Sequence, residues 1–294
     1  MELRSAALTV LCISDPDAKV LALQSLWKAH GQTSTHGMPS QHRTGDGNQV
    51  MLAEGLSLDT QKIFSCEGLV VPGRPCRPLL CPPQQVPNRS VHTELGLAAM
   101  VHAIGHIEFN AINLALDAIW RYPQMPAAYY FDWFKVAYEE STHFAWLANL
   151  LQTMGHRYGD FEAHDGLWAM CEKTAEDVLA RMALVPRTLE ARGLDATPLI
   201  QSKLHLSNSA HARTLEKILE TILRDEVGHV AVGNHWFRWL CAQQGLDPQV
   251  HYPVLVTHHA SPRLKPPFNE EARLRAGFTA DEIDWLMAQR WDVG

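Results

Sequence analysis

The stretch RDEVGHV, residues 224–230, places two acids, a two-residue gap and a histidine inside a run with the apolar spacing of a helix. Residues three apart in a helix lie on one face, so the side chains of Glu226 and His229 can reach the same atom. The other members of this face are apolar or small: Leu215, Leu219, Ile222, Gly233, Trp236 and Leu240. Burying a carboxylate and an imidazole costs free energy, so the pattern favours a bound cation at this position.

The stretch YEESTHF, residues 138–144, repeats this layout and places Glu140 and His143 on a second apolar face. A third helical run carries Glu108 as the single acid on its apolar face. An uncompensated buried carboxylate costs several kcal/mol, and three of them at similar depth would require cations to share. The sequence therefore predicts metal ligands on three helices.

Long helical patterns fill the chain from about residue 93 to 244, with almost no strand-like alternation. Turn-forming residues divide this region into four predicted helices, at 93–122, 126–154, about 164–193 and 209–244. The third is predicted to end at Gly193, with Pro198 as a second stop signal. Four helices of roughly thirty residues each predict an all-α protein built on a four-helix bundle.

The residues before this region have a different composition. The segment from Ser14 to about residue 30 has helical spacing, and Ser14 is expected to cap that helix. Gly, Ser, Thr, His and Gln dominate residues 31–49, which predicts a loop. Prolines then recur between Val71 and Arg89, which forbids a regular helix and predicts an extended strap.

After Gly245 the chain is again rich in proline as far as Pro267, and a last short helix is predicted from Thr279, its N-cap, to Arg290. The sequence therefore predicts three parts: an N-terminal helical and proline-rich extension at 1–90, the bundle at 91–245, and a C-terminal extension packed on the bundle at 246–294.

Composition limits the classes to which the chain can belong. Its 294 residues are 46% hydrophobic, enough for a sizeable core, and no run approaches the roughly eighteen consecutive apolar residues of a membrane helix. The N-terminus lacks a signal-peptide pattern, so we expect a cytoplasmic protein. The net charge of -7 gives no general attraction to nucleic acid or anionic membranes, although a local basic patch would still allow nucleic-acid binding. The six cysteines are scattered, and we expect them to be reduced.

The third predicted helix offers several acids for one ligand position, because Glu172, Glu176 and Glu190 lie on its apolar face. If this helix starts at His164 and runs the length of the bundle, Glu176 lies near mid-height, about 18 Å along at about 1.5 Å per residue. If the segment before Pro186 is instead a crossover, Glu190 lies at the metal. Helix depth leaves both possibilities open.

Four longer stretches, HAIGHIEFNAINLALDA, EESTHF, LEARGLD and RDEVGHVAVGNHWF, resemble a bacterial family of ferritin-like proteins to which no reaction is tied. The resemblance extends through most of the chain and includes VPGRPCRPLL and HDGLW. More distantly, the chain is similar to ferritin-like di-iron proteins such as the tRNA hydroxylase that modifies an isopentenyl-adenosine derivative. In those proteins a similar Glu-Ala-Arg on helix three supplies an iron carboxylate. This likeness implies Glu190 as the ligand here, with Glu176 as the second choice.

The residues and the resemblance together imply a carboxylate-bridged centre of two iron ions, with manganese or a mixed pair as the alternatives. The implied ligands are Glu108, Glu140, His143, Glu190, Glu226 and His229. Such a centre binds and reduces dioxygen, so we expect an oxidase or hydroxylase of a small or apolar substrate that receives electrons from an external donor.

Two other classes share parts of this pattern. A ferroxidase or redox-stress protein would use the same ligands without an organic substrate, but the extensions at both ends favour a covered substrate site or a partner surface. A metal-free scaffold would need basic residues to pair with the buried acids, and only Arg187 and Arg192 lie near any of them in sequence.

His102 and His106 lie four residues apart on the first long helix, on a stripe roughly opposite Glu108. We expect these histidines to be satisfied by hydrogen bonds and to pack against the N-terminal strap, in preference to a role near the metal.

Overall fold

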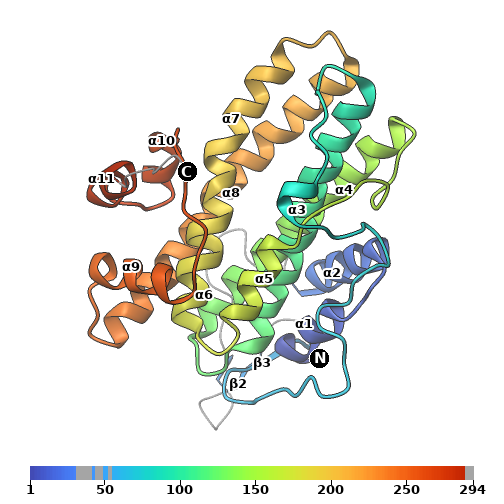
Figure 1. Cartoon of the computed structure of the whole chain (residues 1–294). Helices are drawn as coiled ribbons and strands as arrows, with labels where there is room; N and C mark the ends of the chain where they lie inside the picture. The colour runs from blue at the N-terminus through green and yellow to red at the C-terminus, as the bar shows by residue number, and fades with distance from the viewer. Residues whose placement is uncertain (31–41, 44–48, 52–54, 289–294) are drawn as a thin grey trace. The chain divides into compact units, whose positions relative to one another are not determined.

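The structure is a computed structural model that describes residues 1–30, 42–43, 49–51 and 55–288. The described chain is mainly helical, as predicted (Figure 1). It divides into two compact units, each of which is described by itself. Unit 1 comprises residues 1–90 and 94–165, and unit 2 comprises residues 91–93 and 166–294.

Unit 1 is built around two long helices, α3 (Glu94–Arg121) and α4 (Ala127–Thr153), which pack along each other (Figure 1). Both were predicted, with ends that agree closely. Helix α3 is long and apolar enough to cross a membrane by length and composition, but 72% of its apolar window is buried inside the protein. This burial is typical of the core helix of a soluble protein.

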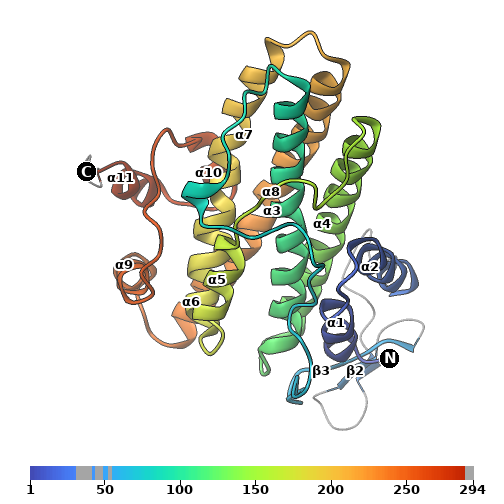
Figure 2. The same ribbon diagram turned by 45° about the vertical axis from the view of Figure 1, so that its right-hand side comes forward.

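Two shorter helices, α1 (Leu3–Leu11) and α2 (Pro16–His30), pack on α3 and α4 respectively (Figure 2). Helix α2 was predicted, but its cap is Asp15, not Ser14, because the Asp15 carboxylate accepts a hydrogen bond of 2.8 Å from the Ala18 amide. Helix α1 was not predicted.

Arg4 of α1 explains why this first helix lies where it does. Its fully buried guanidinium donates to the carbonyls of Ile119 at 3.3 Å and Trp120 at 2.9 Å, in the last turn of α3. It also donates to the carbonyls of Asp59 and Lys62. The last carbonyls of a helix lack partners within the helix, so Arg4 supplies the cap that α3 needs.

A small antiparallel sheet follows, with the strand order β1 (His42–Arg43), β2 (Gln49–Met51) and β3 (Ser57–Asp59). Val50 lies opposite Leu58 in this sheet. The loop predicted for residues 31–49 falls mostly outside the described residues, and where it is described it is strand. The pairing of β1 with β2, and of β2 with β3 after the predicted loop, overrides the local loop composition.

The proline-rich strap is extended, as predicted, apart from one short 3-10 turn, η2 (Pro83–Gln85). Lys19 of α2 fixes its start, because the buried Nζ donates to the carbonyls of Gly73 at 3.0 Å and Leu11 at 3.1 Å and to the Asn113 side chain on α3. Position 73 must be glycine, since a Cβ there would lie 2.1 Å from the Cys12 carbonyl oxygen. All six cysteines are free.

Unit 2 is built around α8 (Ala210–Gln243), which matches the predicted helix at 209–244. Three consecutive segments pack beside α8 as one rod: α6 (Val178–Leu184), the π-helical turn η3 (Val185–Glu190) and α7 (Ala191–His205) (Figures 1 and 2). Residues 206–209 join α7 to α8, so these two helices run in opposite directions.

The prediction of one continuous helix at about 164–193 is wrong, because several separate segments occupy this range. A separate helix, α5 (Gly166–Lys173), comes first, and a turn at 174–177 separates it from α6. Asp177 caps α6 by accepting a hydrogen bond of 3.0 Å from the Ala180 amide, which explains the new start.

The predicted end at Gly193 is also wrong, because α7 continues through Gly193 and Pro198. A proline inside a helix cannot donate to the carbonyl four residues earlier, here that of Leu194. The side-chain amide of Asn269 donates to this carbonyl instead, at 3.1 Å. A contact from a distant segment thus replaces the lost bond.

Three further helices complete the described part of unit 2: α9 (Pro248–His258), α10 (Glu270–Arg275) and α11 (Ala280–Ala288). Helix α11 was predicted, and Thr279 caps it as expected by accepting from the Glu282 amide at 3.2 Å. The predicted end at Arg290 lies outside the described residues. Helices α9 and α10 were missed because prolines masked them, although Pro248 occupies the first position of α9, where its missing N–H costs no hydrogen bond.

Candidate metal centre

Unit 1 brings together three of the predicted ligands. Glu108 comes from α3, and Glu140 and His143 come from one face of α4; their exposed fractions are 3%, 0% and 1%. His143 Nδ1 lies 3.3 Å from Glu108 Oε2 and 3.3 Å from Glu140 Oε2. One ligand atom from each residue lies within 4.8 Å of the other two, which is close enough for all three to bind one cation.

The electrostatics of this triad also suit a cation. Burial, together with the neighbouring Glu140, raises the pKa of Glu108 well above its ordinary value. Burial lowers the pKa of His143, but hydrogen bonds and attraction to Glu108 and Glu140 outweigh burial and raise this pKa to about 11. The imidazole therefore holds a proton between two acids at neutral pH, and a divalent cation bound there would displace it.

Unit 2 carries the second Glu-x-x-His pair on α8. Glu226 and His229 are both buried, and His229 Nδ1 lies 3.8 Å from Glu226 Oε1. Val227 and Val230 on the same two turns share a core cluster with α7 residues Ala191 and Leu194. The first turn of α7 is thus at the level of the pair.

Glu190 ends the π-helical turn directly before Ala191, with 6% of its surface exposed. Pro186 of this turn contacts Gly233 of α8. Because the rod of α6, η3 and α7 runs opposite to α8, four residues forward from Pro186 and four residues back from Gly233 lead in the same direction along the pair. This register brings Glu190 to the level of His229.

Glu176 is placed differently. It lies in the turn between α5 and α6, where its side chain is exposed, and outside the buried η3 segment. The structure therefore gives Glu190, and not Glu176, the burial and level that a ligand beside Glu226 and His229 requires.

The close approach at Gly233 gives a direct test of this register. A Cβ at position 233 would lie 2.6 Å from two atoms of the Pro186 ring, so Gly233→Ala must displace η3. We expect this variant to lose about 1–3 kcal/mol of unfolding free energy, measured by urea titration. Gly228→Ala on the same helix is the control, because nothing lies within 4 Å of a Cβ there. Equal stability of the two variants would show that the contact does not fix the register.

The π-helical turn itself was not predicted. Pro186 lacks the N–H that would continue the α-helical ladder, and the Thr188 hydroxyl donates to the Ala183 carbonyl at 2.8 Å. One extra residue in a helix rotates everything after it by about 100°, so the turn sets the direction in which Glu190 points. The available signal in the sequence was Pro186 inside the run that was predicted to be one helix.

His102 and His106 are buried, and their hydrogen-bond partners are Asn110 on α3 and residues 158–164. The Gly159 amide donates to His102 Nε2 at 3.0 Å, and His106 lies 2.8 Å from the Tyr158 hydroxyl and 3.1 Å from the His164 carbonyl oxygen. Burial lowers the pKa of each histidine to about 4, so both are neutral at pH 7. Their contacts hold residues 158–164, which follow α4, against α3.

The two arginines that a metal-free scaffold would need are used elsewhere. Arg187 donates to the Glu282 carboxylate at 2.7 Å and to the Asn234 side chain, and Arg192 is exposed. Their positions give no support to neutralisation of Glu108, Glu140, Glu190 or Glu226 by these two arginines.

Known proteins resemble this chain over most of its length. The family model described as "Protein of unknown function (DUF455)" matches residues 12–284. A protein of Haemophilus influenzae (strain ATCC 51907 / DSM 11121 / KW20 / Rd), named only as uncharacterised, is 50% identical over 219 residues, which are 72% of this chain and 75% of that protein. No solved structure matches the chain.

Proposed function

Because the chain belongs to the DUF455 family, whose function is unknown, we propose its function from the chemistry of its buried side chains. It is a di-metal carboxylate protein that uses dioxygen to oxidise a small or apolar substrate. The observation that carries this proposal is the buried triad of Glu108, Glu140 and His143, with ligand atoms within 4.8 Å of one another. Its donors, two carboxylates and an imidazole, suit iron or manganese.

The ligand set supports a second ion. Glu226 and His229 repeat the spacing of Glu140 and His143, and Glu190 supplies one more buried carboxylate. Four carboxylates and two histidines on helices are the set of the ferritin-like di-iron and di-manganese proteins. We infer that all six residues serve one pair of iron ions in a ferritin-like four-helix bundle, with manganese as the alternative metal.

A bound pair of ferrous ions would supply the electrons with which dioxygen is reduced. The chain's own residues prepare the site for this chemistry. Glu108 and Glu140 provide negative charge that binds the cation, and His143 gives up its proton when it becomes a ligand. On α4, which carries Glu140 and His143, the side chains of Trp133 and Phe144 are 0% and 2% exposed, and Phe144 packs on Phe109 of α3 beside Glu108. These apolar surroundings favour an apolar substrate.

A ferroxidase or redox-stress protein would use the same ligands without an organic substrate. In unit 1, α1 packs on α3 and α2 packs on α4, an addition that iron oxidation alone does not need (Figure 2). This observation favours a substrate-oxidising enzyme, which also requires an external electron donor.

Metal content tests the proposal first. Untagged protein should contain about two iron or manganese ions per chain by elemental mass spectrometry, and Glu226→Ala should lose at least one of them. Asp225→Ala is the matched control, because Asp225 is the adjacent acid and pairs with Arg224 at 3.0 Å. Protein that takes up no metal after anaerobic ferrous loading would refute the proposal. Oxygen uptake that continues past the ferrous iron supplied, and only with an organic substrate and a reductant, would separate an oxidase from a ferroxidase.

A further inference from the structure

Arg187 lies inside the π-helical turn, three residues before Glu190, and only 2% of it is exposed. Its guanidinium packs against three aromatic rings, at 5.2 Å from Phe237, 4.8 Å from Tyr252 and 4.6 Å from Phe278. Burying the Arg187 guanidinium costs free energy unless its N–H groups donate to acceptors. The residues that supply these acceptors therefore also fix the turn on which Arg187 lies.

Two polar side chains hold Arg187. Asn234 of α8 accepts from one guanidinium nitrogen, and Glu282 of α11 accepts from another at 2.7 Å. The second oxygen of Glu282 accepts from Arg238 of α8 at 2.9 Å and from the Thr279 amide at 2.8 Å. Glu282 therefore ties together η3, α8 and the start of α11.

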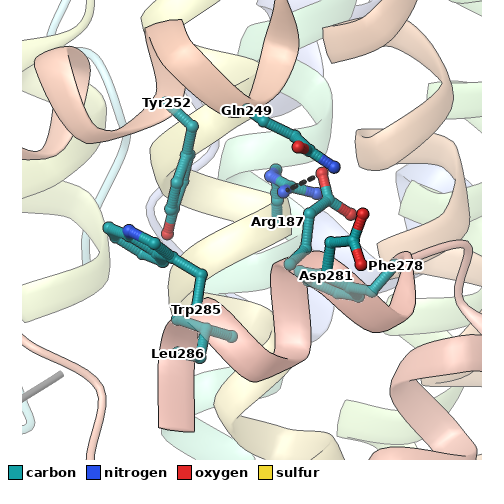
Figure 3. Close-up of a pocket in the computed structure, with 8 residues that line it drawn as sticks. Arg187, Gln249, Tyr252, Phe278, Asp281, Trp285 and Leu286 are labelled. Atoms are coloured by element: carbon teal, nitrogen blue, oxygen red, sulfur yellow. Dashed lines mark hydrogen bonds and ion pairs between the residues drawn. The ribbon is translucent and has the colours of Figure 1, made fainter. Parts of the chain in front are cut away.

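A cavity of about 140 Å³ borders this ion pair. Figure 3 shows Arg187 at its inner end, with Tyr252 and Trp285 on one side and Asp281 and Phe278 on the other. The cavity leaves room beside Glu282, so an amide at position 282 fits without overpacking the core.

The turn needs these outside contacts because its own hydrogen bonds are incomplete. Pro186 cannot donate, and the Thr188 hydroxyl is shared between the Ala183 carbonyl at 2.8 Å and the Tyr252 hydroxyl at 2.7 Å. A π-helical turn that relaxed to an α-helical one would swing Glu190 by about 100° around the helix. Contacts from α9 and α11 therefore decide where Glu190 points.

We propose that Arg187 is a positioning residue for the metal ligand Glu190, and that α11 sets the ligand's direction through the Glu282–Arg187 ion pair. The C-terminal extension is thus part of the metal site's framework, although it supplies no ligand. This inference rests on the proposed function, which makes Glu190 a ligand.

The test compares two carboxylate-to-amide variants of the full chain. Glu282→Gln neutralises the partner of Arg187. Asp195→Asn neutralises the partner of another buried arginine, Arg273, whose guanidinium lies 2.5 Å from the Asp195 carboxylate. This change removes no hydrogen bond of Arg187, although both guanidinium groups pack on the Phe278 ring. Both variants remove an ion pair of the C-terminal extension, so both should lower the melting temperature of the metal-free protein.

Only Glu282→Gln should affect the turn. In the metal-free protein, amide hydrogen exchange at residues 187–190 should quicken about tenfold or more in Glu282→Gln and stay unchanged in Asp195→Asn. In titrations with Mn²⁺, one of the two ions should bind about tenfold or more weakly to Glu282→Gln, and both should bind normally to Asp195→Asn.

The two readouts separate the two proposals. Unchanged exchange at residues 187–190 in Glu282→Gln would overturn the positioning role, whether or not metal binds. Faster exchange with both Mn²⁺ ions bound as in the wild type would also overturn it, because the turn would then not direct a ligand. If the wild-type chain binds no metal at all, the proposed function fails, and the positioning of a metal ligand fails with it.

Discussion

Glu108→Gln is expected to raise the stability of the metal-free protein and to abolish binding of the metal ion at the α3–α4 triad. Glutamine keeps the shape of the side chain but cannot carry the negative charge that a cation needs. Burial and the nearby Glu140 raise the pKa of Glu108, so its ionisation opposes folding. A gain in unfolding free energy is therefore expected at pH 7, because each unit by which the folded chain raises this pKa corresponds to about 1.4 kcal/mol.

The pH dependence of this gain follows from the direction of the shift. The folded chain keeps its proton on Glu108 to a higher pH than the unfolded chain does. Its stability therefore falls as pH rises above the ordinary glutamate pKa of about 4.3, and Glu108→Gln should escape this loss. Urea unfolding with a chelator at several pH values measures it, with the exposed Glu94→Gln on the same helix as the control. A less stable Glu108→Gln at pH 7 would contradict this account.

Added metal should reverse the order of stability. A ligand present at about 100 times its Kd stabilises the folded state by about 2.7 kcal/mol, and only the wild-type triad would gain this stabilisation. A variant that is more stable without metal and less stable with it would show that the acids are kept for binding and not for folding.

Metal affinity at the triad is expected to rise about tenfold or more for each pH unit between about 6 and 8. His143, with a pKa raised to about 11, is protonated throughout this range in the metal-free protein. A cation must displace that proton, and loss of one proton per ion bound gives a tenfold change per pH unit. Metal affinity must fall as pH falls, because protons compete more strongly with the metal for His143 at lower pH.

Calorimetry in buffers of different ionisation enthalpy would count the protons released as Mn²⁺ binds. About one proton or more per ion at pH 7 is the expected result. Affinity that stays constant from pH 6 to 8 would mean that the metal does not replace the proton on His143.

The sequence was sufficient to predict the helices that carry the triad and the second Glu-x-x-His pair. Helices α3, α4 and α8 follow from apolar residues at helical spacing, a property that neighbouring residues set by themselves. The same spacing predicted that Glu140 and His143 lie on one face. In the structure, His143 Nδ1 lies 3.3 Å from Glu108 Oε2 and 3.3 Å from Glu140 Oε2. Local periodicity was enough in these segments because each helix buries one continuous face.

The prediction of the third helix was wrong because the bounds and continuity of this segment depend on residues far away in the chain. Pro198 stays helical because Asn269, 75 positions beyond Leu194, satisfies the carbonyl of that leucine. The π-helical turn before Glu190 is held by Glu282, 95 positions beyond Arg187. Proline and glycine are stop signals only when no distant partner replaces the hydrogen bonds that they remove, and such partners leave no local pattern.

The cap that Arg4 provides has a consequence for how the chain folds. Arg4 is separated from the two carbonyls that it caps by 115 and 116 positions, so this contact forms only after a very long loop has closed. The pairing of α3 with α4 needs closure of a loop of only a few residues, and short-range contacts of this kind form faster. We therefore expect Glu108, Glu140 and His143 to meet early in folding, while α1, although it precedes α3 in the chain, packs on the end of α3 late.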